Sequence, residues 1–310
     1  MKYVHLFILA FLTSNAIYSQ NASIEKDVKV NPYVYGTLLQ PKEGAENLII
    51  IIPGSGPTDR NGNQQLTRNN SLRILAEKLT AAGIATFRYD KRVLTLLKKG
   101  ALQEEKLRFD DFVDDATATV TYFSSRNKYK NIYIIGHSQG SLVGMIAAQK
   151  LNITGFISLA GPGQAIDQTI LSQIALQMPD LKDKAKEAFM QLKENGKVKK
   201  YSPALSSIFR PETQPFMASW MQYDPKAELK KLEIPVLVIG GTNDIQVDTK
   251  EAKTLKEAKP DASLILIKNM NHVLRIIEGT DSLENTKSYN EPKRPISEEL
   301  IRVITDFVTK

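Results

Sequence analysis

The chain has 310 residues, of which 42% are apolar, so it can bury one large core and fits a single domain with an insertion. It contains no cysteine, which excludes disulfides, thiolate metal sites and a lipid-modified N-terminal cysteine. The net charge of +7 includes a lysine-rich stretch over residues 182–200, but acidic residues interrupt it as on a solvated helix face. No nucleic-acid-binding motif accompanies that stretch, and nothing in the sequence calls for a cofactor or a metal.

The first segment, residues 1–20, has the proportions of a secretory signal peptide. One lysine precedes an apolar run from Tyr3 to Leu12, and a more polar end follows, with cleavage expected near Ser19 or Gln20. The alternative is an uncleaved N-terminal anchor. We expect export to the periplasm or the medium, a mature domain over residues 21–310, and no membrane association of that domain, because no other run has the length of a membrane span.

Strand and helix patterns alternate along the chain as in a mostly parallel sheet with crossover helices. The N-terminal half is predicted to contain a hairpin of strands 33–39 and 47–52, a helix over 71–82, a strand over 84–89 and a helix over 109–124. Arg88 and Arg92 flank the end of the strand over 84–89, where they could pair with Asp59 or Asp90 or hold a substrate carboxylate.

Four aspartates open the helix predicted over 109–124, at positions 110, 111, 114 and 115. Such a cluster could suggest a metal site. The positive end of the helix dipole together with solvent exposure is the better explanation.

A Gly-x-Ser-x-Gly sequence stands between the apolar run 131–135 and the helical run 141–151. Strand, tight turn and helix are the context in which this pentapeptide forms a nucleophile elbow, and the serine is Ser138. Gly136 and Gly140 are expected because a Cβ two residues from the strained serine would collide with backbone.

Sheet character pauses after the strand predicted over 153–159 and returns at Ile234. The region of about 164–230 is helical or proline-punctuated, which predicts a helical cap insertion. Its large apolar residues either line an acyl pocket or pack the cap onto the rest of the fold: Met178, Met190, Met217, Trp220 and Met221.

A serine hydroxyl needs a base to take its proton and a carboxylate to orient that base. Of the three histidines, His5 lies in the signal segment and His137 belongs to the elbow, where its side chain is expected to point away from Ser138. His272 is therefore the predicted base.

The chain order of this fold is serine, acid, histidine, so the acid lies between Ser138 and His272. Asp244 directly follows a buried strand over 234–241 and is the predicted acid. Asp248 is the local competitor, but it suits the N-cap of the next helix.

The developing oxyanion requires two backbone N–H donors. Gln139, next to the nucleophile, is expected to supply one. The other should come from the small-residue loop 53–57 after an early strand, with Ser55 as first choice and Gly56 as second. The alternative is a tight turn that simply needs its glycines.

These motifs resemble the α/β-hydrolase superfamily from about Val34 onward. The loop 53–63 resembles a bacterial esterase subgroup with Gly-Ser-Gly-Pro-x-Asp-Arg, and Arg88-Tyr89-Asp90-Lys91-Arg92 resembles its next strand end. Relatives usually continue with glycine, whereas this chain has Val93 to Leu97. The resemblance implies an α/β-hydrolase fold and hydrolysis of small-molecule acyl esters or thioesters through an acyl-serine.

Three alternatives stay open at this point. A serine peptidase of the same fold would need an acidic anchor for a free amino terminus, for which Glu187, Glu194 and Glu212 are present without a distinctive spacing. An acyltransferase would have to exclude water. A catalytically silent ligand-binding protein could use the same scaffold.

Overall fold

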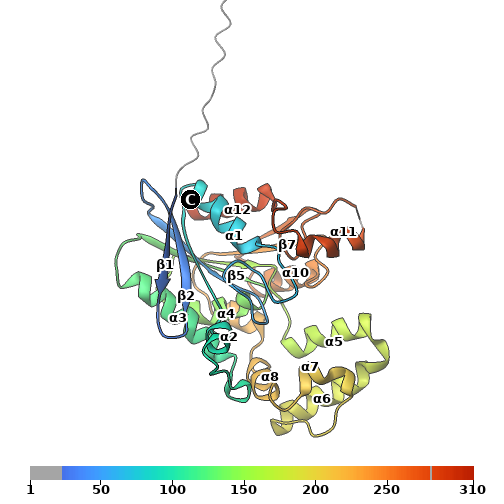
Figure 1. Ribbon diagram of the computed structural model, residues 1–310. Coiled ribbons are helices and arrows are strands. Elements are labelled where there is room, and N and C mark those ends of the chain that lie inside the picture. The colour runs from blue at the N-terminus through green and yellow to red at the C-terminus, as the bar shows by residue number, and fades with distance from the viewer. Residues whose placement is uncertain (1–22, 280) are drawn as a thin grey trace, which may run out of the picture.

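The computed structural model describes residues 23–279 and 281–310, so the predicted signal peptide lies outside the described residues. Within the described part, an eight-stranded sheet has helices on both faces, and a helical lobe extends from one end (Figure 1). The strand order is β1-β2-β4-β3-β5-β6-β7-β8. The two pairs formed by β2 are antiparallel, and all the others are parallel.

The strands follow the apolar runs of the sequence. Their bounds are β1 Ser23–Lys29, β2 Tyr35–Pro41, β3 Asn47–Ile52, β4 Ala85–Tyr89, β5 Asn131–His137, β6 Gly155–Leu159, β7 Val236–Gly241 and β8 Ser263–Ile267.

One face of the sheet is covered by α1 and α12, and the other by α3, α4, α9 and α10 (Figure 1). The helices have the bounds α1 Ser71–Ala81, α2 Arg92–Lys98, α3 Asp110–Ser124, α4 Gln139–Ala148, α5 Ile166–Gln177, α6 Lys182–Asn195, α7 Ser206–Phe209, α8 Gln214–Trp220, α9 Pro225–Lys230, α10 Thr249–Ala258, α11 Ser282–Lys287 and α12 Glu298–Thr309. Four 3₁₀ turns join them: Glu104–Lys106, Pro179–Leu181, Pro203–Leu205 and Ser288–Asn290.

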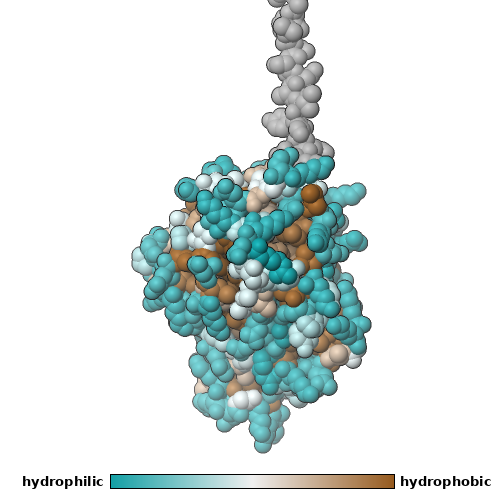
Figure 2. Space-filling model, turned by 90° about the vertical axis from the view of Figure 1, so that its left-hand side faces the viewer, coloured by the Kyte–Doolittle hydropathy of each residue, from teal (hydrophilic) through white to brown (hydrophobic). Residues whose placement is uncertain are grey.

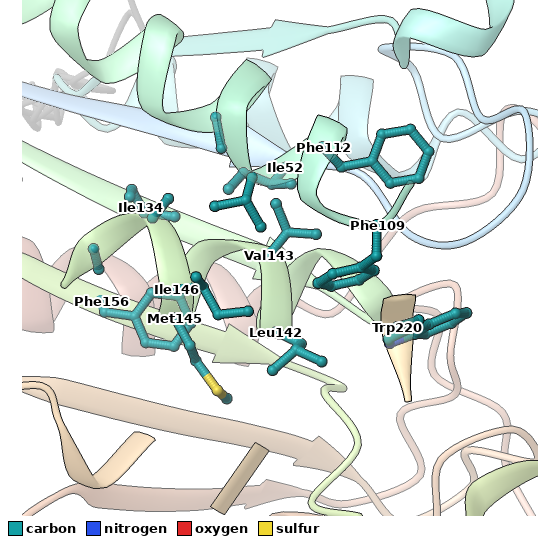
Figure 3. Close-up of a cluster of buried hydrophobic side chains, with 14 of the residues drawn as sticks. Ile52, Phe109, Phe112, Ile134, Leu142, Val143, Met145, Ile146, Phe156 and Trp220 are labelled. Carbon is teal, nitrogen blue, oxygen red and sulfur yellow. The ribbon is translucent and has the colours of Figure 1, made fainter. Parts of the chain in front are cut away.

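The central strands carry apolar side chains to both faces. On β3, Ile50 and Ile52 enter the cluster under α3 and α4, whereas Ile49 and Ile51 enter the cluster under α1 and α12. All four are buried, and burying a side chain of this size contributes roughly 1.5–3 kcal/mol. Figure 3 shows the first cluster, in which Ile52 lies beside Val143 of α4. This packing fixes the strand ends that carry the site.

The hairpin predicted for strands 33–39 and 47–52 is wrong. β2 pairs with β1 on one side and with β4 on the other, while β3 lies between β4 and β5. β1 was not predicted because its sequence, SIEKDVK, is polar and all but Val28 of its side chains are exposed. An exposed edge strand lacks the alternating apolar pattern that identifies strands in sequence.

Helices α5 to α9 lie between β6 and β7, and α5, α6 and α7 form the protruding lobe (Figure 1). The large apolar residues of this region were expected either to line an acyl pocket or to pack the cap onto the rest of the fold. Met217, Trp220 and Met221 are buried, which agrees with packing. Trp220 stacks on Phe109 with ring centroids 5.6 Å apart (Figure 3). Met178 and Met190 are exposed instead.

The face seen from the left of Figure 1 is largely hydrophilic, with small hydrophobic groups between polar ones (Figure 2). Among residues 23–279 and 281–310, no helix is both long and apolar enough to cross a bilayer.

Candidate active site

Ser138 occupies a strained turn between β5 and α4, with φ 55° and ψ −123°. A Cβ on Gly140 would lie 2.4 Å from the carbonyl oxygen of Ile52, and a Cβ on Gly136 would lie 2.2 Å from that of Gly140. Only glycine fits such approaches. The predicted reason for both glycines is confirmed, and the turn has the geometry of a nucleophile elbow.

Asp244 and His272 meet across the ends of β7 and β8. His272 Nδ1 lies 2.7 Å from Asp244 Oδ2, and the two side chains are 6% and 1% exposed. The other oxygen, Asp244 Oδ1, accepts the backbone N–H groups of Gln246 at 2.8 Å and Val247 at 2.9 Å. An ionised carboxylate can only accept hydrogen bonds, so Nδ1 of His272 carries the proton and Nε2 keeps its lone pair.

Several of the residues predicted for the site line one cavity of about 280 Å³. Ser138, His272, Ser55 and Gly56 all line it. Asp248, the competitor for the acid, instead caps α10 by accepting the N–H of Lys250 at 2.9 Å, as expected for an N-cap.

His137 does not point away from Ser138 as expected, because it lines the same cavity. Its Nε2 donates to the backbone carbonyl of His272 at 2.9 Å, and the two rings lie 4.9 Å apart. Burial lowers the pKa of His137 to about 4, and a proton on the neighbouring His272 would lower it further. His137 is therefore a neutral imidazole that supports the loop of His272.

The loop after β3 lies directly against the elbow. A Cβ on Gly54 would come within 3.2 Å of Ser138 Cβ. The carbonyl of Ser55 accepts hydrogen bonds from Thr58 Oγ1 at 2.7 Å and from Gln64 Nε2 at 2.8 Å, which hold the loop in place. In the described part of the chain, the N–H groups of Ser55 and Gln139 donate to no protein acceptor.

The expected pairing of Arg88 or Arg92 with Asp59 or Asp90 is wrong. Asp90 is bound by Arg60, whose guanidinium donates to Oδ2 at 2.7 Å and whose backbone N–H donates to Oδ1 at 2.9 Å. Asp59 binds the backbone N–H groups of its own loop. Arg88 is buried, and its Nε donates to the side chain of Asn61 at 3.3 Å. None of these arginines binds a carboxylate in the way the sequence suggested.

Arg92 forms a buried ion pair with α3. Its Nε and Nη2 each donate at 2.8 Å to one oxygen of Asp115, and it also contacts Asp111. The Asp115 side chain is 2% exposed, and burial raises its pKa while Arg92 opposes the rise. Explaining this aspartate by solvent exposure was therefore wrong: Asp115, the sixth residue of α3, is buried against Arg92.

A second cavity, of about 320 Å³, adjoins the first at Gly56. Its wall is mainly apolar and comes from α2, α3, α8 and the segment between α2 and α3. Val93 and Leu97, from the run that replaces the glycine expected after Arg92, belong to α2 and line this cavity. The run that departs from the expected motif therefore forms a helix, and its apolar side chains line the cavity.

Several site residues were not found from the sequence. Gln64, Asn69, Gln246 and Tyr289 line the cavity around Ser138, although no sequence spacing connects them. Lys91 is a further one: it is 5% exposed and lies between the loop after β3 and the elbow. Lys91 lies within the strand-end motif Arg88 to Arg92, but no role was expected for the lysine itself. No group of three His, Asp or Glu side chains within residues 23–279 and 281–310 could hold a metal ion.

Comparison with known proteins agrees with this geometry. The family model described as serine aminopeptidase, S33, matches residues 69–276, more than half of the chain. The chain belongs to this family. The match contains Ser138, Asp244 and His272, as well as the insertion between β6 and β7.

Individual relatives extend the likeness to most of the chain. Esterase EstD of Thermotoga maritima is 27% identical over 283 residues, which are 88% of this chain and 66%, just under two thirds, of that relative. The solved structure of Est1E from Butyrivibrio proteoclasticus is 18% identical, with a TM-score of 0.56 over 92% of this chain and 99% of that one. The Pyrococcus furiosus esterase Pf2001 is 14% identical, with a TM-score of 0.52 over 93% and 92%. The predicted α/β-hydrolase fold is confirmed.

Proposed function

We propose that this protein is a serine hydrolase that cleaves carboxylic esters, or thioesters, through an acyl-serine on Ser138. The observation that carries the proposal is the hydrogen bond of His272 to Asp244, on the wall of the cavity that Ser138 also lines. An oriented neutral imidazole beside a strained serine is the arrangement that makes a hydroxyl nucleophilic.

In this mechanism, His272 Nε2 takes the proton from Ser138 Oγ as the oxygen attacks the acyl carbonyl. The N–H groups of Gln139 and Ser55 bind the oxyanion of the tetrahedral intermediate, and Asp244 stabilises the imidazolium. The imidazolium then gives its proton to the leaving alcohol or thiol. Water attacks the acyl-serine with His272 again as base, which releases the acid and restores the serine.

The apolar cavity next to Gly56 supports an ester with a hydrocarbon portion. Phe112, Val93 and Leu97 on its wall offer no group that would bind a peptide backbone. We further propose, from the Gly-Ser-Gly-Pro-x-Asp-Arg loop, that the chain belongs with bacterial carboxylesterases that share it. The activity suggested by the name of the esterase relative agrees with ester hydrolysis.

A serine aminopeptidase is the second candidate, because the matching family carries that description. Such an enzyme needs a free carboxylate to bind the substrate amino terminus. Glu104 and Glu212 line the apolar cavity, but both pair with Arg210. Glu187 and Glu194 on α6 line neither cavity. These contacts favour ester hydrolysis.

The test is a panel of p-nitrophenyl esters of graded acyl length, run beside aminoacyl and peptidyl p-nitroanilides. We expect ester turnover that Ser138→Ala removes. Ser141→Ala is the matched control, since Ser141 lies in the first turn of α4, three residues from Ser138, and its hydroxyl forms a hydrogen bond with Ser158 at 2.7 Å. Comparable turnover of the amides would favour the peptidase. Ser138→Ala with substantial activity would contradict the mechanism.

A catalytically silent binding protein is tested separately. A fluorophosphonate probe should label the wild-type protein at Ser138 and should fail to label Ser138→Ala, with the site read by peptide mass spectrometry. A wild-type protein that stays unlabelled would revive the silent alternative.

We also propose that the protein is exported, on the strength of the signal-like segment over residues 1–20. N-terminal sequencing of the protein from the periplasmic fraction or the medium of an expressing bacterium should begin near residue 20 or 21. A protein that keeps Met1 and stays in the cytoplasm would contradict this.

A further inference from the structure

Lys91 follows β4 and places its ammonium group between two segments of the site. Nζ donates to the carbonyl oxygen of Gly54 at 3.0 Å and to the side-chain oxygen Oε1 of Gln139 at 2.6 Å. It also lies 4.0 Å from the centroid of the Phe112 ring. The three N–H bonds of an ammonium group therefore all have acceptors in the protein, and none is left for a ligand.

The carbonyl that Lys91 holds belongs to the same peptide group as the N–H of Ser55. No described peptide bond is cis, so the C=O of Gly54 and the N–H of Ser55 point in opposite directions from one rigid plane. Holding the oxygen on the Lys91 side consequently fixes the direction of the N–H. Gln139, the other residue that Lys91 holds, carries the second proposed oxyanion donor on its own backbone.

We propose that Lys91 is a positioning residue that sets the two oxyanion N–H groups at their working separation by joining the Gly54–Ser55 peptide to the side chain of Gln139. This inference rests on the proposed serine hydrolase mechanism. It adds a residue that also lines the apolar cavity but acts on the reacting atoms only through the two donors.

The burial of Lys91 makes a purely structural role a poor explanation. Burial lowers the pKa of Lys91 to about 7, against a weaker opposing effect of Asp115, which is itself paired with Arg92. No carboxylate of residues 23–279 and 281–310 forms an ion pair with its Nζ. A buried cation without a charge partner is costly. Methionine removes that cost but leaves the Gly54 carbonyl and Gln139 Oε1 without their donor, so the two effects on stability oppose each other. The fold should therefore tolerate its replacement.

The experiment compares Lys91→Met with wild type in steady-state ester hydrolysis, fluorophosphonate labelling and thermal unfolding. We expect kcat to fall about 10- to 100-fold, because loss of one oxyanion donor costs about 100- to 1,000-fold and a misaligned donor less. KM should change less than about 3-fold, the labelling rate should fall with kcat, and Tm should change by less than about 5 °C. Lys259→Met is the matched control: Lys259 is also buried, but it pairs with Asp261, and its kcat should equal that of wild type.

A double-mutant cycle with Gln139→Met tests the route of the effect. This variant keeps the backbone N–H but removes the side-chain amide whose oxygen accepts from Lys91. We expect a smaller loss of kcat than in Lys91→Met. The double variant should be no slower than Lys91→Met alone, because both changes break one connection. Losses that multiply in the double variant, or a kcat of Lys91→Met within about 2-fold of wild type, would overturn the inference. If Lys91→Met does not fold, a wild-type kcat for Gln139→Met would overturn it.

Failure of the proposed function would look different. A wild-type protein without labelling, or an active Ser138→Ala, would remove the hydrolase mechanism and the inference with it. A wild-type protein labelled at Ser138, combined with equal labelling of Lys91→Met, would remove only the role of Lys91.

Discussion

Acid should destabilise this protein through His137, whose protonation in the folded state is opposed by burial. His137 donates Nε2–H to the carbonyl of His272, and its pKa is lowered to about 4 from an ordinary value of 6.5. The unfolded chain therefore binds a proton as the pH falls through 6.5, while the folded chain resists it until about 4. The fold loses stability across this window as the pH falls, and nothing is lost above pH 7.

The difference between the two pKa values sets the size of the effect. Each unit corresponds to about 1.4 kcal/mol, so the full loss below pH 4 is about 3 kcal/mol. At pH 5 the unfolded imidazole is almost fully protonated and the folded one is mostly neutral, so about 2 kcal/mol is already lost. That is a large share of the stability of an ordinary domain.

The variant that isolates this effect is His137→Gln, because glutamine keeps an N–H donor for the carbonyl of His272 and does not titrate. Urea unfolding of both proteins at pH 7.5 and pH 5.0 gives the change in free energy of unfolding for each. We expect the wild-type change to exceed that of His137→Gln by about 2 kcal/mol, since all other titrating groups are common to both. Equal changes in the two proteins would refute the reasoning.

Three further outcomes follow from the contacts of the site. Gly140→Ala should lower the free energy of unfolding by at least about 2 kcal/mol, because its Cβ would lie 2.4 Å from the carbonyl oxygen of Ile52. Gly196→Ala is the control, since its Cβ would meet open space, and it should cost about 1 kcal/mol. Urea unfolding of both variants measures the two changes. Asp115→Asn leaves the Arg92 guanidinium without its buried charge partner and should cost about 3 kcal/mol in the same assay, against less than about 1 kcal/mol for Arg302→Met at an exposed pair. Asp244→Asn should lower kcat about 10⁴-fold with the fold intact, because the tautomer of His272 is no longer fixed; a loss below about 10-fold in ester turnover would contradict this role.

Local rules were enough to predict the elbow and its partners. Strand, turn and helix around Ser138 are contiguous in sequence, and the glycines report a steric requirement within a few residues. Asp244 and His272 could be chosen because each follows a strand, and parallel strand ends meet at one edge of a sheet. The structure places Ser138 and His272 on the wall of one cavity, and Asp244 within hydrogen-bonding distance of His272.

Contacts between distant segments were not predictable in this way. Arg60 binds Asp90 thirty positions away, and Lys91 binds Gln139 across an even longer separation. The sequence suggested that Arg88 or Arg92 would pair with Asp59 or Asp90, but Arg92 instead binds a buried aspartate on α3. The partner that each charged side chain binds depends on how the loop after β3 and the helix α3 pack onto the end of β4. A pattern of residue types does not contain that information.

The end of β4 explains why two sequence motifs occur together in this chain. Asp90 and Lys91 are consecutive residues that directly follow β4. Asp90 binds Arg60 of the loop after β3, while Lys91 binds Gly54 of the same loop and also Gln139. A loop held at two points by one dipeptide cannot shift relative to the elbow without breaking one of the contacts. The precision of the proposed oxyanion site thus depends on β4, a strand that contributes no catalytic residue.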